Sequence, residues 1–127
     1  MTGTSCWFDT PSDEQTTAQM ASRGYVSVQV QYSNGAYPQT CDAFMKKARP
    51  MFDPTVARSV TAVLCARDDV DCDKGIALFG FSQGAQLCSL GKYYDKRIGA
   101  AFLIGHGTAA TDYQDFTSCM SADSMPG

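Results

Sequence analysis

The pattern of hydrophobic and polar positions divides the first part of the chain into a helix and a strand. Residues 13–22 are mostly polar and predict a short helix capped by Ser12, with Gly24 as its left-handed stop. Residues 25–32 alternate strictly between apolar and polar side chains and are rich in β-branched residues. That alternation is typical of a strand with one buried face, so we predict a strand there.

Two helices and an acidic loop are predicted in the middle of the chain. Residues 41–49 and 55–66 have helical spacing of apolar positions, with interruptions expected at Pro50 and Pro54. The acidic residues of the segment 68–73 follow. Their spacing lacks the glycine and the bidentate glutamate of an EF-hand loop, so we expect a solvated loop between helix and strand, with weak binding of a hard cation as the alternative.

Two almost wholly apolar segments flank a further helix. Residues 75–79 and 97–104 predict strands, and residues 83–94 between them are compatible with a helix. Continuous apolar strands separated by helices are typical of a parallel sheet with both faces covered. The predicted fold class is therefore α/β, a three-layer sandwich with a short parallel sheet.

The motif Gly-x-Ser-x-Gly lies at the junction of the first of these strands and the helix. Gly80, Ser82 and Gly84 occupy its fixed positions. In a strand–turn–helix context this motif holds the serine in a strained turn with its hydroxyl exposed, and the next backbone N–H, here that of Gln83, faces a developing oxyanion. Ser82 is therefore the candidate nucleophile and Gln83 a candidate oxyanion donor. The alternative is a glycine-rich turn without chemistry.

Several stretches resemble α/β-hydrolases, and the resemblance covers roughly residues 3–107. Residues 20–26, Met-Ala-Ser-Arg-Gly-Tyr-Val, look like the helix end and strand start of many esterases and lipases in that superfamily. Residues 80–85, preceded by Cys72 and an Asp and followed by Arg-Ile-Gly-Ala at 97–100, are similar to the elbow of cutinases. They are also close to the elbows of carboxylesterases.

The resemblance implies a serine hydrolase that lacks parts of the family's fold. The family has an earlier strand, whose end carries part of the oxyanion hole, and by position Gly3, Thr4 or Ser5 would supply that donor. A frayed N-terminus is the alternative for this segment. The family's later strands deliver the catalytic acid and then the histidine, whereas only about twenty residues follow the last strand seen here. We therefore expect a truncated or minimal α/β-hydrolase, one domain over residues 1–127 with its core at about 3–107 and a tail at 108–127.

His106 is the one histidine of the chain, so any mechanism that pairs serine with histidine within the chain must use it. It follows the strand 97–104, which should neighbour the strand that leads to Ser82, and both residues then lie at the same sheet edge. A loop histidine without a catalytic role is the alternative. Asp112 and Asp115 could orient it, with solvated surface carboxylates as the alternative.

Composition and charge exclude several classes of partner. The chain has 127 residues, 44% hydrophobic and 18% charged, with a net charge of −3, so no basic face for nucleic acid is expected. No apolar run approaches the length of a membrane span. The six cysteines favour an oxidising compartment or export, although no signal peptide is visible. Cys88, on the helix after the serine, is predicted to be a small core residue.

The sequence thus predicts a serine hydrolase of the esterase or lipase type. Its substrate would be a small-molecule carboxylic ester, cleaved through an acyl-enzyme on Ser82 without a cofactor. The alternative is a catalytically inactive hydrolase fragment or binding module that completes its sheet by association. In both cases the absence of the family's earlier strand would leave the apolar strands at 75–79 and 97–104 poorly covered. We therefore expect a dimer or larger assembly.

Overall fold

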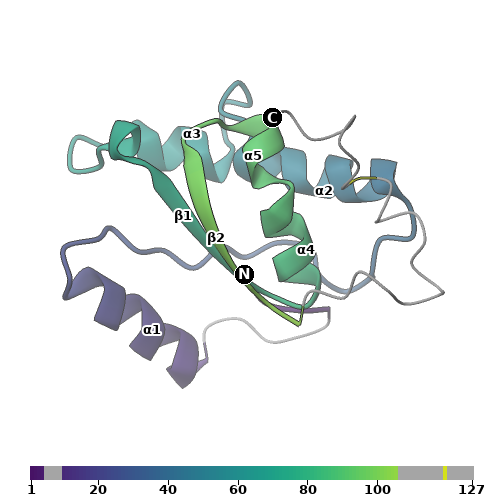
Figure 1. Cartoon of the computed structure of the whole chain (residues 1–127), viewed down its shortest axis with the longest axis horizontal. Coiled ribbons are helices and arrows are strands. Elements are labelled where there is room, and N and C mark those ends of the chain that lie inside the picture. The colour runs from purple at the N-terminus through teal and green to yellow at the C-terminus, as the bar shows by residue number, and fades with distance from the viewer. Residues whose placement is uncertain (5–9, 106–118, 120–127) are drawn as a thin grey trace.

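The computed structural model describes residues 1–4, 10–105 and 119, which form a mixed α/β fold (Figure 1). Two strands are separated by two short helices, and the candidate nucleophile lies between the first strand and the helix that follows it. In chain order the elements are α1 Pro11–Ala21, α2 Cys41–Phe52, α3 Val60–Cys65, a 3-10 turn Cys72–Lys74, β1 Ile76–Phe81, α4 Gln83–Ser89, α5 Gly91–Tyr94 and β2 Ile98–Ile104.

The sheet of the described residues consists of β1 and β2, which run parallel as predicted. The pairing runs to the last residues of both strands, where Phe81 lies opposite Ile104. Helix α4 crosses back from β1 and packs against both strands, and α2 packs against α4 and α5 (Figure 1). The carboxyl ends of both strands therefore meet at one edge, directly at the start of α4.

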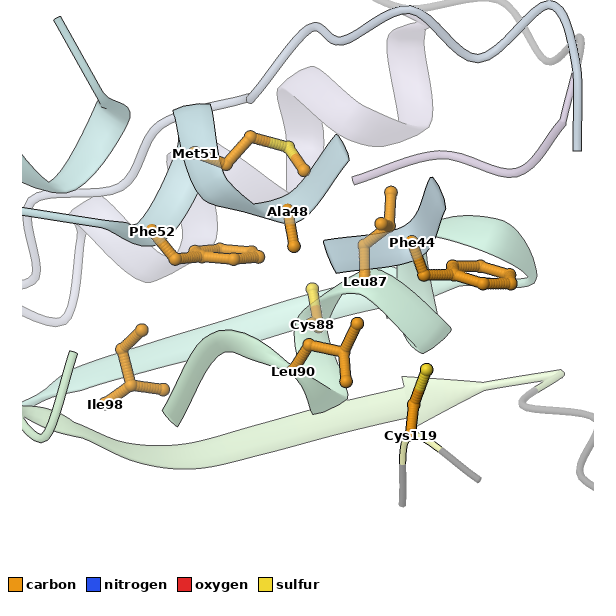
Figure 2. Packing of buried hydrophobic residues seen from close by; sticks show 9 residues of the cluster. All are labelled: Phe44, Ala48, Met51, Phe52, Leu87, Cys88, Leu90, Ile98 and Cys119. Atoms are coloured by element: carbon orange, nitrogen blue, oxygen red, sulfur yellow. The ribbon is translucent and has the colours of Figure 1, made fainter. Parts of the chain in front are cut away.

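The core lies between α2 and the α4–α5 segment. On α2 the buried residues Phe44, Ala48, Met51 and Phe52 follow helical spacing, so they form one apolar face. Figure 2 shows these side chains opposite the residues from α4 and β2. The cluster comprises Phe44, Ala48, Met51, Phe52, Leu87, Cys88, Leu90, Ile98 and Cys119. It fixes α4, and with it the turn at Ser82.

The predicted cover on both faces of the sheet, and with it the three-layer sandwich, is not confirmed by the part of the chain that the structure describes. Along β1, Phe79 and Phe81 are 47% and 46% exposed, and along β2, Phe102 and Ile104 are 63% and 42% exposed. Helix α1, on the other side of the strands from α4 in Figure 1, buries none of its own residues. Within the described residues one face is packed and the other presents an open row of apolar side chains.

The predicted strand at 25–32 is also wrong. Residues 25–34 have no strand assignment, and Tyr25, Val26 and Val28 are exposed. A strand requires a neighbour for its backbone hydrogen bonds, and local alternation alone does not provide one. The edge of β1 away from β2 is instead contacted by Met1, whose amino group donates to Phe79 O at 2.8 Å and whose carbonyl accepts from Phe81 N at 3.0 Å.

Helix α1 begins two residues earlier than predicted, at Pro11. Its N-cap is Thr10 and not Ser12, since the Thr10 side chain accepts from Asp13 N and the Asp13 carboxylate accepts from Thr10 N in a capping box. Pro11 then occupies the first turn, where a missing N–H costs nothing. The left-handed stop is confirmed, because Gly24 has φ of 87°.

The predicted interruption at Pro50 is wrong, because α2 continues through it to Phe52. Pro50 lies in the last turn, and the buried Met51 and Phe52 behind it hold the helix together by packing. Helix α3 is shorter than the predicted 55–66. It begins only after Ser59, whose hydroxyl accepts from Ala62 N at 3.1 Å.

The predicted helix at 83–94 is divided into α4 and α5 at Leu90. Gly91 begins α5 where a Cβ would lie 2.7 Å from a side-chain carbon of Leu78 on β1. The close approach brings this turn onto the sheet, and the chain then reverses into β2.

Two disulfides link the outer parts of the fold. Cys41, at the start of α2, is bonded to Cys119, and Cys65, at the end of α3, is bonded to Cys72. Cys88 is free and buried, which confirms it as a core residue. Burial raises the pKa of its thiol to about 11, so it stays protonated and unreactive near neutral pH.

Candidate active site

Ser82 stands in a backbone conformation that side chains rarely adopt. Its φ is 52° and its ψ is −120°, and among the described residues it is the one non-glycine with positive φ. Strain of this kind persists only where the surroundings impose it, and it clusters at functional sites. Ser82 is half-buried at the N-cap of α4, and its side chain makes no capping hydrogen bond to that helix. The hydroxyl is therefore not committed to the role that a serine at this position normally has.

The two glycines of the motif are required by close backbone contacts. A Cβ on Gly80 would lie 2.5 Å from Gly84 O, because α4 turns back directly over the end of β1. A Cβ on Gly84 would lie 2.5 Å from Thr2 O and 2.6 Å from Met1 O. These contacts force the turn between strand and helix to be sharp, as the motif predicts.

The end of β2 joins the turn through the backbone. Ser82 N donates to Ile104 O at 2.8 Å, which extends the parallel pairing to the candidate nucleophile. A Cβ on Gly105 would lie 3.7 Å from Ser82 N. The prediction that the strands before Ser82 and His106 are neighbours is thus confirmed. His106 itself, together with Ser5, Asp112 and Asp115, lies outside the described residues.

The start of α4 supplies one candidate oxyanion donor. Gln83 is the first residue of the helix, and its backbone N–H has no acceptor within the helix because of its position. The carbonyl of Ser82 already accepts from Ala85 N at 2.9 Å and Gln86 N at 3.2 Å. Among the described residues no acceptor binds the Gln83 N–H, which lies next to Ser82 at the start of α4.

The Gln83 side chain is fully buried and joins three segments. Its Nε2 donates to Thr4 Oγ1 at 2.8 Å and to Ala36 O at 3.1 Å. Its Oε1 accepts from Lys47 Nζ at 3.4 Å. A buried amide whose hydrogen-bonding groups are all used is rigid, because breaking any of these bonds leaves an unsatisfied polar group.

The N-terminal residues next to Thr4 are also held by hydrogen bonds from the segment 32–34. Tyr32 donates its hydroxyl to Thr2 O at 2.5 Å, and Asn34 Nδ2 donates to Gly3 O at 2.8 Å. Gly3 is buried and Thr4 half-buried. Of the three residues named as second oxyanion donors, the structure thus brings Thr4 into contact with Gln83, whereas Ser5 is not among the described residues.

Sequence reasoning missed the residues that support this arrangement. The local pattern indicates only a surface charge on an amphipathic helix for Lys47 and a turn residue for Asn34. Their roles depend on contacts across more than ten residues of chain, which no local pattern reports. The one available signal was Gln83 itself, a long polar residue within a motif that packs tightly between strand and helix.

Two surface cavities lie elsewhere. Both are lined from the segment 28–33 and from α3, the second also from α2, and Ser82 lines neither of them. Within the described ranges no group of three or more side chains is suited to hold a metal ion, and no helix is long and apolar enough to cross a membrane.

Comparison with known proteins adds no further constraint. The chain matches no family model, no curated protein and no solved structure. The function must therefore be argued from the site.

Proposed function

We propose that the protein is a serine hydrolase that cleaves a small carboxylic ester. The observation that carries this proposal is the conformation of Ser82, strained at φ of 52° between a strand and the first residue of a helix. A structural turn would use glycine there, because glycine adopts positive φ without strain. A serine that keeps the strained conformation is expected where its hydroxyl is used.

In the proposed reaction the Ser82 oxygen attacks the ester carbonyl carbon while its proton passes to a base. The carbonyl oxygen becomes an oxyanion that accepts from the Gln83 backbone N–H and from Thr4. The tetrahedral intermediate collapses, the alcohol leaves with the proton from the base, and the acyl group remains on Ser82. Water then attacks the acyl-enzyme, and the carboxylic acid leaves as the serine regains its proton.

His106 is the base in this proposal, since it directly follows Gly105, whose backbone lies beside Ser82. Asp112 is proposed to orient it. The resemblance to α/β-hydrolases and the parallel order of β1 and β2 support a minimal or partial fold of that type. No cofactor is needed for the steps above.

Hydrolysis of an activated short-chain ester tests the proposal. We expect turnover that Ser82→Ala abolishes, with a rate that follows one ionisation at about pH 6–7, the usual range of imidazole. His106→Ala should then lower the rate of ester hydrolysis about 10²–10⁴-fold, which is the usual contribution of positioned proton transfer. Turnover that survives Ser82→Ala would contradict the proposal, and a flat pH profile with an active His106→Ala variant would remove His106 from it.

A second function is favoured by the open face of the sheet. Phe79 and Phe102 stack on it with ring centroids 5.5 Å apart, although both are about half exposed or more. An inactive module that associates through this face would retain the elbow only as a structural turn. Such a module should give no ester turnover while forming assemblies, and this combination separates it from the hydrolase.

A further inference from the structure

Lys47 uses every hydrogen of its ammonium group. The group can donate three hydrogen bonds and accept none. Its Nζ donates to Ser33 O at 2.8 Å, to Ala36 O at 2.9 Å and to Gln83 Oε1 at 3.4 Å. The charge is thereby fixed between the segment that follows Tyr32 and the residue after the candidate nucleophile.

This contact determines which end of the Gln83 amide faces which segment. An ammonium group cannot accept a hydrogen bond, so the amide oxygen must point to Lys47. The amide nitrogen then points to Thr4 Oγ1 and Ala36 O, and both of its hydrogens are used. With the amide reversed, its nitrogen would face Lys47 donor to donor, at a buried position where such a mismatch is costly.

The orientation of the amide determines what the Thr4 hydroxyl can do. Thr4 Oγ1 accepts from Gln83 Nε2, so its own hydrogen is left for another acceptor. In the described part of the chain that hydrogen is given to no other group. A reversed amide would instead take this hydrogen on its oxygen and remove Thr4 as a donor.

We propose that Lys47 is a positioning residue for the oxyanion site, acting through the Gln83 side chain to keep Thr4 as a hydrogen-bond donor. The inference rests on the proposed hydrolase function for its catalytic consequence. Gln83 then contributes twice, once by its backbone N–H and once by the side chain that orders the second donor. Lys47 touches no reacting atom.

The chain offers a matched control in the adjacent lysine. Lys46 lies on the same helix, but its side chain is 77% exposed and pairs with Asp42 at the surface. Lys47→Met and Lys46→Met remove the same charge and keep the same length of stem. Lys47→Arg restores a group that only donates, and Thr4→Ser keeps the hydroxyl that Thr4→Val removes.

The experiment measures ester kcat and KM and the rate of fluorophosphonate labelling for these variants. Lys47→Met should lower kcat and the labelling rate about tenfold or more with little change in KM, because the oxyanion forms only in the transition state. Lys47→Arg should keep most of the wild-type rate, Thr4→Ser should keep most of the rate that Thr4→Val loses, and Lys46→Met should behave as wild type. Adding Lys47→Met to Thr4→Val should slow the reaction little further, since Lys47 acts through Thr4. Equal rates for Lys47→Met and wild type would overturn the inference.

A readout independent of catalysis separates this inference from the proposed function. In ¹⁵N–¹H spectra the side-chain amide of Gln83 should give two exchange-protected signals in wild type and Lys46→Met, and should lose protection in Lys47→Met. Unchanged amide signals in Lys47→Met would overturn the positioning role. Protection that is lost in a protein without labelling would instead support the contact and overturn the hydrolase.

Discussion

The carbonyl oxygen of Gly84 lies so close to Gly80 that a Cβ on Gly80 would be 2.5 Å from it. These two glycines are four residues apart, and their contact determines how sharply β1 turns into α4. We predict that Gly80→Ala lowers the free energy of unfolding by about 1–3 kcal/mol, because the added carbon meets backbone that cannot move aside independently. Urea denaturation followed by circular dichroism measures this.

The matched control is Gly99→Ala on β2. A Cβ at Gly99 meets nothing within 4 Å, and its backbone is not in the left-handed region. This variant should be as stable as wild type or slightly more stable, since alanine restricts the unfolded chain. Equal destabilisation by both substitutions would contradict the proposed close turn.

At position 82 the glycine variant of the protein should be more stable than the alanine variant. In ordinary strands and helices glycine is the weaker residue, but at φ of 52° it relieves strain that alanine keeps. We predict that Ser82→Gly exceeds Ser82→Ala in free energy of unfolding by about 1–3 kcal/mol. The reverse order in urea denaturation would mean that the serine is not held in this conformation.

The local chemistry of the sequence predicted the parts of the fold that depend on neighbours in the chain. The two apolar segments became β1 and β2, their parallel order followed from the helical connection, and the turn at Ser82 has the strain that its motif implies. The end of α1 at Gly24, a glycine with positive φ, was likewise predicted from the local sequence.

Features that depend on distant contacts could not be predicted. Residues 25–32 alternate as a strand would, but among the described residues no strand pairs with them. Pro50 would normally end a helix, and burial of the residues after it outweighs that tendency. The contact of Lys47 with Gln83 joins α2 to the turn at Ser82, and the sequence of neither segment alone predicts it.

The two disulfides should differ in their contribution to stability. The pair Cys41–Cys119 spans a sequence separation of 78, and the pair Cys65–Cys72 a separation of 7. Since a cross-link restricts the unfolded chain more when it closes a longer loop, the chain-entropy relation gives about 4–5 kcal/mol for the first and about 2–3 kcal/mol for the second. Alanine replacement of both cysteines of each pair, followed by urea denaturation, measures the difference. A larger loss from the shorter loop would contradict it.

The open face of the sheet should mediate self-association. Phe102, 63% exposed beside Phe79, is its most exposed large side chain, so Phe102→Glu should shift the protein towards monomer. Val63→Glu on α3 is the control, since Val63 is 55% exposed but lies outside this face. Light scattering at micromolar concentration measures both. A wild type that is monomeric throughout this range would contradict the prediction.

The most direct test of the account is covalent labelling of Ser82 by a fluorophosphonate probe, with the modified peptide identified by mass spectrometry. The phosphorus reacts with an activated serine oxygen and fluoride leaves, so labelling requires the same nucleophile and oxyanion site as ester cleavage. We predict modification at Ser82 in the wild type and none in Ser82→Ala. Folded wild-type protein that remains unlabelled, or a label that persists in Ser82→Ala, would contradict the assignment of Ser82 as the nucleophile.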